Sequence, residues 1–187
     1  MLHDNFLQQK QDILSKNDKS NIGRWDEKIK KLCDKINHKE NYYTTSSCSG
    51  RIIVMIEQEK KAPDLFKFVS HNLVDSETFL KYLSKETAKL DLKFKQEPCI
   101  IHVSCKTLKD AQIFLDKAKL SGWKNSGIIA TEKRFVVEIS GTEKLEFPLT
   151  KNGKILVDDV FLKIVLKKCN ENLKKSWERI NKLEKII

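Results

Sequence analysis

Apolar residues recur along this chain with two different spacings, and the order of these spacings limits the fold. Apolar residues recur with helical spacing in five segments, which predicts helices at both chain ends and in the interior of the sequence. These helices cover about residues 5–15, 24–37, 76–90, 107–122 and 158–187. Strand-sized segments lie between them, at about residues 52–56, 66–70, 97–105, 127–130, 135–140 and 145–149. This alternation predicts an α+β fold with a mixed sheet, helices at both chain ends and an internal pseudo-duplication.

Glycine usage excludes the common nucleotide-binding loops. None of the six glycines occurs as Gly-x-Gly, so neither a dinucleotide fingerprint nor a Walker loop is present, and a Rossmann methyltransferase is not expected.

The length of the chain suits one domain that spans residues 1–187. The most apolar run, at 52–56, is much shorter than the about 18 to 20 residues of a membrane span. Because residues 1–5 also lack a secretory signal, we expect a cytoplasmic protein without a membrane anchor.

The five cysteines are scattered and form no Cys-x-x-Cys pair. Neither a disulfide framework nor a structural metal site is therefore expected. The chain is also basic, with 36 Lys and Arg against 26 Asp and Glu and a formal net charge of +10. Such a balance suits a nucleic-acid partner, although an AT-biased genome would produce it without selection for binding.

A hydroxyl-rich segment leads into the strand predicted at residues 52–56. Five of the six residues from Thr44 to Ser49 carry a hydroxyl group, and Gly50 and Arg51 follow. We expect a loop in which short donors, close backbone approach and a guanidinium fork bind a phosphate or a carboxylate. Only four of the basic residues are Arg, which indicates that the planar guanidinium of Arg51 has a specific binding role that lysine would not fill.

Four further residues could take part in chemistry. Cys48 could be a nucleophile with His71 or His102 as its base, although a small buried residue is the more common role of a free cysteine. His102 stands among apolar strand residues and could be a structural histidine, a base or a stacking ring. Glu97 precedes Pro98, which holds it extended and could aim its carboxylate into a site.

The order of several rare motifs resembles the tRNA wybutosine-synthesizing protein 3 family over nearly the whole chain. The motifs of the first half are Asp18-x-Ser20-x-x-Gly23-x-x-Asp26-Glu27, then Tyr43 to Ile52 without interruption, then Glu97-Pro98-x-x-x-His102-Val103-x-Cys105. Those of the second half are Asp110 to Ile113, Ser121 to Ile128, and Glu146-x-Pro148-Leu149 followed by Gly153-Lys154.

The resemblance implies a methyltransferase that uses S-adenosyl-L-methionine as co-substrate. It implies methylation of the N4 ring nitrogen of a demethylated wyosine intermediate, 3′ of the anticodon in phenylalanine tRNA. The residues it suggests for orienting the base or accepting a proton are His71, Glu97 and His102. Those it suggests for the cofactor are Ser46, Ser47, Ser49 and Arg51, and those for the substrate are Asp18, Ser20, Lys124, Asn125 and Ser126.

Two other function classes remain open from the residues alone. A non-catalytic RNA-binding module would carry the same charge, and a thiol hydrolase would depend on Cys48. The residues alone also do not show which side chains contact the methyl donor and which contact the modified base. The oligomeric state is open as well.

The charge leads to a first testable prediction. If lysines of this chain bind tRNA phosphates, the logarithm of the tRNA binding constant should fall steeply and linearly with the logarithm of salt concentration, because each contact releases counterions. Filter binding across a salt series measures this slope. A nearly flat line would show that the +10 charge has no part in RNA binding.

Overall fold

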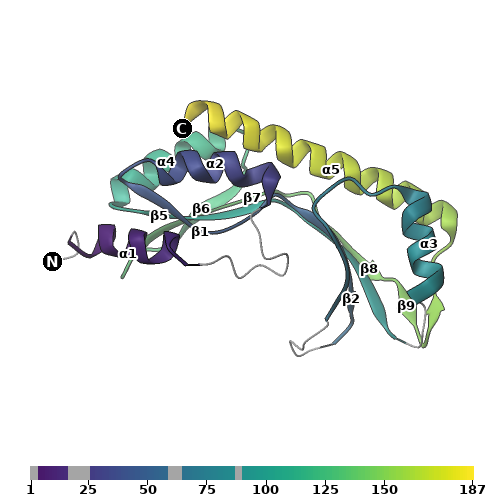
Figure 1. The fold of residues 1–187 in the computed structure, drawn as a ribbon. Coiled ribbons are helices and arrows are strands. Elements are labelled where there is room, and N and C mark those ends of the chain that lie inside the picture. Colours follow the sequence, from purple (N-terminus) through teal and green to yellow (C-terminus); the bar gives the residue numbers. More distant parts are fainter. Residues whose placement is uncertain (1–3, 17–25, 59–64, 87–89) are drawn as a thin grey trace. The chain divides into compact units, whose positions relative to one another are not determined.

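The computed structural model describes residues 4–16, 26–58, 65–86 and 90–187, which form two compact units (Figure 1). Unit 1 comprises residues 1–49, 99–142 and 177–187, and unit 2 comprises residues 50–98 and 143–176. The chain therefore passes between the units four times, after Ser49, Pro98, Thr142 and Ser176. Neither unit is a continuous stretch of sequence.

Unit 1 is a four-stranded antiparallel sheet with helices on it. The strand order is β1-β5-β7-β6, with β1 at Tyr42–Cys48, β5 at Ile100–Cys105, β6 at Asn125–Ala130 and β7 at Phe135–Ser140. Its helices are α1 (Asp4–Leu14), α2 (Glu27–Asn37), α4 (Leu108–Leu120) and the last turns of α5 (Asp159–Ile186). Figure 1 shows α2, α4 and the end of α5 on one face of this sheet, with α1 on the other.

The core of unit 1 lies between the sheet and the helices α2, α4 and α5. It is built from the apolar faces of both layers, at Ile29, Leu32, Ile36, Ile101, Val103, Ala111, Phe114, Ala118, Trp123, Val137, Ile139, Ile180 and Leu183. Because side chains alternate along a strand, the residues between these positions in β5 and β7 point to the opposite face. That face carries the polar residues discussed below.

Unit 2 contains a second four-stranded antiparallel sheet. Its order is β3-β2-β4-β8, with β2 at Arg51–Ile56, β3 at Phe66–Ser70, β4 at Leu92–Glu97 and β8 at Leu145–Pro148. A short hairpin of β9 (Thr150–Lys151) and β10 (Lys154–Ile155), the helix α3 (Ser76–Glu86) and residues 159–176 of α5 complete the unit.

Aromatic rings form much of the unit 2 core. Phe94 of β4 stacks on Phe147 of β8 with ring centroids 5.0 Å apart, and it meets Phe79 of α3 edge to face at 5.8 Å. A buried polar pair joins β4 to α5, because the Asn172 amide donates to Gln96 Oε1 over 2.9 Å. The pair fixes how α5 lies on the sheet, since an unpaired buried amide would be costly.

The α+β class is confirmed, and most predicted elements are found. The capping box that opens α4 is present, because the Thr107 hydroxyl accepts from the Asp110 amide and the Asp110 carboxylate accepts from the Thr107 amide. Gly122 ends the helix with a φ of 93°, and the Trp123 amide reaches back to Ala118 O. The single domain and the internal duplication stay predictions.

Three expectations were wrong in detail. The sheets are antiparallel where a mixed sheet was predicted, since the described strands β1 to β8 all run antiparallel to the strands they pair with. The segment predicted as a hydroxyl-rich loop is strand β1 up to Cys48, because Tyr and Thr favour extended backbone. The strand predicted at 97–105 is two strands that belong to different units, since the chain passes from one unit to the other at Pro98.

Among the described residues, no helix has the length and apolarity that crossing a membrane requires.

Trp123 gives a test of the unit 1 core. Its side chain is fully buried, so Trp123→Ala should lower the free energy of unfolding by about 3 to 5 kcal/mol, as large aromatic truncations do. Urea denaturation measures this change. The control is Leu120→Ala at the last residue of α4, where the side chain is 84% exposed. The free energy of unfolding should there change by no more than about 0.5 kcal/mol. Equal costs for the two variants would contradict the assigned core.

Candidate functional site

A row of three polar side chains crosses the unit 1 sheet on the face opposite the core. The register places Ser46 of β1 opposite His102 of β5, and His102 opposite Glu138 of β7. Ser46 Oγ lies 2.6 Å from His102 Nδ1, and His102 Nε2 lies 2.6 Å from Glu138 Oε2. Both nitrogens of the imidazole are therefore engaged, one by a hydroxyl and one by a carboxylate.

The chemistry of these partners assigns the protons of the row. An ionised carboxylate only accepts hydrogen bonds, so His102 Nε2 carries the hydrogen that faces Glu138. In the neutral ring, Nδ1 then has a free lone pair, and the Ser46 hydroxyl donates to it. A proton arriving at Ser46 can pass to Nδ1, and the resulting imidazolium remains paired with Glu138. The row is thus arranged as a proton acceptor.

The surroundings leave this row accessible. The side chains of His102 and Glu138 are 26% and 35% exposed, and Ser46 is exposed. Gly127 of edge strand β6 stands opposite Glu138, and a Cβ built there would meet nothing within 4 Å. Open space therefore borders the carboxylate end of the row, as a ligand would need.

A bulge in β1 decides which hydroxyl faces the histidine. The pairing with β5 shifts between Thr44 and Ser46, so that Thr44 is opposite Val103 and Ser46 is opposite His102. Asn37, at the end of α2, accepts from the Thr44 amide over 2.8 Å and donates to its hydroxyl over 3.1 Å. Without the bulge, Thr44 and Ser46 would point to the same face.

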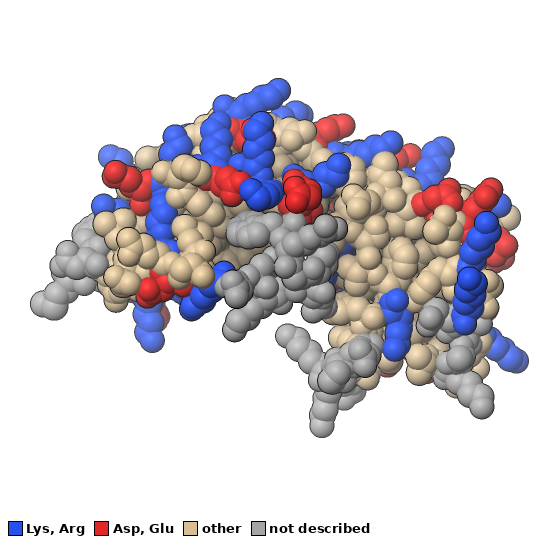
Figure 2. All heavy atoms as spheres, in the orientation of Figure 1, with Lys and Arg blue, Asp and Glu red and all other residues tan. Residues whose placement is uncertain are grey.

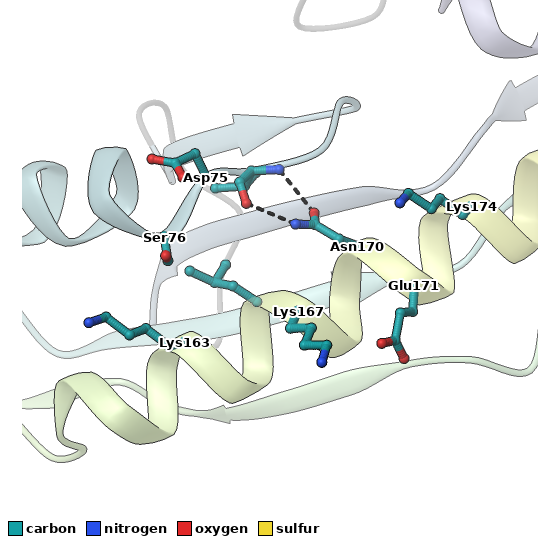
Figure 3. Close-up of a pocket in the computed structure, with 9 residues that line it drawn as sticks. Asp75, Ser76, Lys163, Lys167, Asn170, Glu171 and Lys174 are labelled. Atoms are coloured by element: carbon teal, nitrogen blue, oxygen red, sulfur yellow. Dashed lines mark hydrogen bonds between the residues drawn. The ribbon is translucent and has the colours of Figure 1, made fainter.

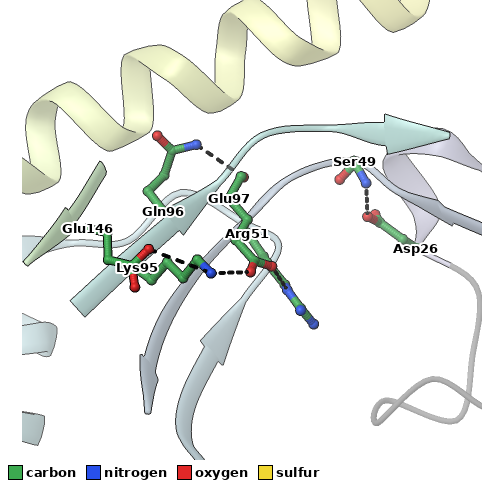
Figure 4. A network of polar contacts seen from close by, with 7 residues as sticks. All are labelled: Asp26, Ser49, Arg51, Lys95, Gln96, Glu97 and Glu146. Carbon is green, nitrogen blue, oxygen red and sulfur yellow. Dashed lines mark hydrogen bonds and ion pairs between the residues drawn. The ribbon is translucent and has the colours of Figure 1, made fainter. Parts of the chain in front are cut away.

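The other predicted serines have different surroundings. Ser47 is opposite Ile101, on the core side of the sheet, and it hydrogen-bonds to Cys33. Burial raises the pKa of the Cys33 thiol to about 12, and the Ser47 bond opposes part of that rise. Ser49 is fully buried, and its amide donates to the Asp26 carboxylate over 2.8 Å (Figure 4). The Ser49 hydroxyl has no hydrogen-bond partner in the described part of the chain.

Arg51 and Glu97 form an ion pair within unit 2. Arg51 Nε lies 2.7 Å from Glu97 Oε2, and the guanidinium lies 5.3 Å from the Phe66 ring centroid. Lys95 also contacts Glu97, at 3.2 Å, so this carboxylate is neutralised from two sides. Figure 4 shows the two terminal nitrogens of Arg51 pointing away from Glu97. The ion pair therefore orients the guanidinium and leaves its outer fork available to a ligand.

The remaining predicted residues are dispersed. His71 is half-buried just after β3 in unit 2. Lys124 and Asn125 are exposed in unit 1, whereas Ser126 is held by the carbonyl oxygen of Trp123. Asp18 and Ser20 lie outside the described residues. Since Arg51, Glu97 and His71 belong to unit 2 and Ser46, Ser47, Ser49 and His102 to unit 1, one shared site stays a prediction.

Sequence reasoning missed Glu138 and Asp26 as site residues. A signal for Glu138 was present, since it is the one charged residue in the apolar strand Phe135–Ser140. Asp26 occurs in a quoted motif, but its contact with Ser49 depends on the tertiary fold. The same geometry disfavours a Cys48 nucleophile with His102 as its base, because Ser46 and Glu138 already engage both ring nitrogens.

Comparisons with known proteins agree with this picture. The family model described as Methyltransferase TYW3 matches residues 8–187. The chain belongs to this family of methyltransferases. This confirms the family expected from the motifs, and with it the expectation of an enzyme that transfers methyl groups.

Individual relatives are similar over most of their length. A Thermococcus sibiricus protein named "tRNA(Phe) 7-((3-amino-3-carboxypropyl)-4-demethylwyosine(37)-N(4))-methyltransferase" is 37% identical over 95% of this chain and 91% of its own. The "tRNA wybutosine-synthesizing protein 3 homolog" of Xenopus laevis is 34% identical over 97% of this chain and 74% of its own. The solved PH1069 protein from Pyrococcus horikoshii is 33% identical, with a TM-score of 0.86 over 98% of this chain and 94% of that chain.

Arg51→Lys tests the outer fork of the guanidinium. Lysine keeps the charge but loses the planar fork, so methyl transfer should slow roughly ten- to hundredfold while the fold stays intact. Single-turnover methylation and melting temperature are measured on one preparation, with Lys85→Ala on the exposed surface as control. Normal turnover together with a stability loss of about 0 to 1 kcal/mol would instead limit Arg51 to pairing Glu97.

Proposed function

We propose that this chain methylates the N4 ring nitrogen of the demethylated wyosine intermediate 3′ of the anticodon in phenylalanine tRNA. Membership of a methyltransferase family and the name of the Thermococcus relative support this reaction. The observation that carries the mechanism is the row of Ser46, His102 and Glu138 on an accessible sheet face. In this proposal the row accepts the proton that the ring nitrogen loses.

S-adenosyl-L-methionine is proposed as the methyl donor, and when bound it supplies an electrophilic sulfonium methyl group. The buried Ser49 hydroxyl, which lacks a partner among the described residues, fits a ligand with several polar atoms. The nearby Asp26 carboxylate fits a positively charged group on that ligand. Ser46, Ser49 and Asp26 are the residues of unit 1 that we propose to hold the donor, and Arg51 of unit 2 is proposed to contact a carboxylate or phosphate.

The protein's own part in the reaction is positioning and proton transfer. As the ring nitrogen gains a carbon, its proton passes to the Ser46 oxygen while the Ser46 proton passes to His102 Nδ1. The positive charge that forms on the imidazole is stabilised by Glu138 at 2.6 Å. Glu138 acts through His102 and is therefore a positioning residue. Solvent then removes the proton and restores the neutral ring.

The basic surface supports an RNA substrate. Figure 2 shows Lys and Arg side chains over the part of unit 1 where Figure 1 draws α2 and α4. An anticodon loop presents unstacked bases and a dense row of phosphates, which a basic surface can bind.

We also propose a cytoplasmic location.

A methylation assay tests the proposal directly. The protein is incubated with labelled S-adenosyl-L-methionine and tRNA from cells that lack this modification step, and the nucleosides are then separated. Label in a methylated wyosine nucleoside is the expected result. Tight tRNA binding without any transfer of label would instead favour a non-catalytic RNA-binding module.

Glu138→Gln tests the proton acceptor. The amide oxygen can still accept from His102 Nε2, but it no longer stabilises the imidazolium, so turnover should fall by roughly tenfold or more. Single-turnover methylation rates and melting temperatures measured on one preparation show whether turnover falls while the fold is kept.

Two variants accompany this measurement. Glu132→Gln removes an exposed carboxylate of unit 1 outside the row and should leave turnover unchanged. His102→Asn removes the proton acceptor and should abolish most of the activity. If Glu138→Gln lowered only the melting temperature and left turnover unchanged, the carboxylate would be structural.

A further inference from the structure

A basic groove runs along α5 within unit 2, where the start of α3 faces it (Figure 3). Its volume is about 370 Å³. Buried Leu166 of α5 and buried Val74, before α3, form its apolar floor. Three exposed lysines of α5, at positions 163, 167 and 174, line it.

The lysines form a straight row because of their spacing. Positions 163, 167 and 174 are four and seven residues apart, which places all three on one face of an α-helix. At a rise of 1.5 Å per residue, the row is about 16 Å long. In the described part of the chain, none of the three ammonium groups takes part in a hydrogen bond or an ion pair, so their charges are available to a ligand.

The groove has a fixed wall. Asn170 lies on the same face of α5, and its amide oxygen accepts from the Val74 amide over 2.9 Å. Its amide nitrogen donates to the Val74 carbonyl oxygen, also over 2.9 Å. These two bonds between the Asn170 side chain and the Val74 backbone tie the loop before α3 to the helix (Figure 3).

The two acidic residues of the groove are already engaged. The Asp75 carboxylate caps α3 by accepting from the amide and the hydroxyl of Thr78, over 2.9 and 3.0 Å. These bonds lower the pKa of Asp75, so it remains a charged cap. Glu171 lies 4.0 Å from Lys168, outside the row. Lys168 offsets the charge of Glu171, so the three lysines of the groove face one remaining negative charge, that of Asp75, and the net charge is positive.

We infer that this groove holds the sugar–phosphate backbone of the RNA substrate. A line of about 16 Å suits successive phosphates of a polymer better than one compact phosphate. Lysine offers a point charge without a fixed fork, as suits contacts that position a backbone without reading sequence. The inference rests on the proposed function insofar as the RNA is taken to be the methylation substrate.

The test compares two variants with the same change in charge. The groove variant carries Lys163→Gln, Lys167→Gln and Lys174→Gln, which remove the charges and keep most of each stem. The matched control carries Lys81→Gln, Lys85→Gln and Lys175→Gln, which are exposed positions of the same unit that do not line the groove. Binding of labelled phenylalanine tRNA is measured across a salt series, and melting temperatures show that each variant is folded.

The groove variant should bind tRNA roughly ten- to hundredfold more weakly than the wild type at low salt, and its log–log salt slope should be smaller by about two. The control should lose much less, and turnover at saturating tRNA should be unchanged in both. Equal losses in the two variants would overturn the inference. Equal displacement of the tRNA by polyglutamate and by unlabelled RNA would also overturn it, because the groove would then bind any acidic chain.

The two proposals can fail separately. If the wild type binds tRNA through the groove but transfers no methyl group, the proposed reaction is wrong and the RNA groove stands. If it methylates tRNA and the groove variant keeps its salt slope, the reaction stands and the groove is not part of the RNA interface.

Discussion

The hydrogen bonds between Asn37 and Thr44 hold the feature on which the unit 1 site depends. They fix β1 at a bulge, and a shift of one residue in a strand moves every following side chain to the other face of the sheet. The bulge therefore decides that Ser46 meets His102 and that Ser47 turns toward Cys33. Asn37 ends α2, whose apolar side is packed into the core. The packing of α2 therefore fixes the position of Asn37, and through it the bulge that places Ser46.

The two units contribute different kinds of chemistry. Unit 1 carries a histidine whose two nitrogens both have partners, which suits proton transfer. Unit 2 carries a guanidinium oriented by a carboxylate and a row of three lysines in a groove of net positive charge, which suit binding of anions. The motif from Tyr43 to Ile52 passes from one unit to the other between Ser49 and Gly50. A single continuous motif thus supplies residues to two different structural environments.

Much of the fold was predictable because its signals are local. The capping box at Thr107, the glycine that ends α4 and the helical spacing of α5 each depend on residues a few positions apart. The errors arose where the local sequence pattern was weak or was equally typical of another structure. Lys93 and Lys95 interrupt the apolar residues of β4, and the hydroxyl groups of β1 are as common in loops as in strands. The site was predicted only in part: His102 and Ser46 were named, but Glu138 was not.

The sequence by itself determined the family, the α+β class and most of the helices and strands, since the order of motifs and the period of apolar residues are properties of the chain alone. The tertiary structure decided which of the named residues meet. Cross-strand pairing joined Ser46, His102 and Glu138, whose positions are up to 92 residues apart (138 − 46), and it turned Ser47 away to the core. Such choices depend on strand register and on a bulge, which are set by packing between distant segments and leave no local trace in the sequence.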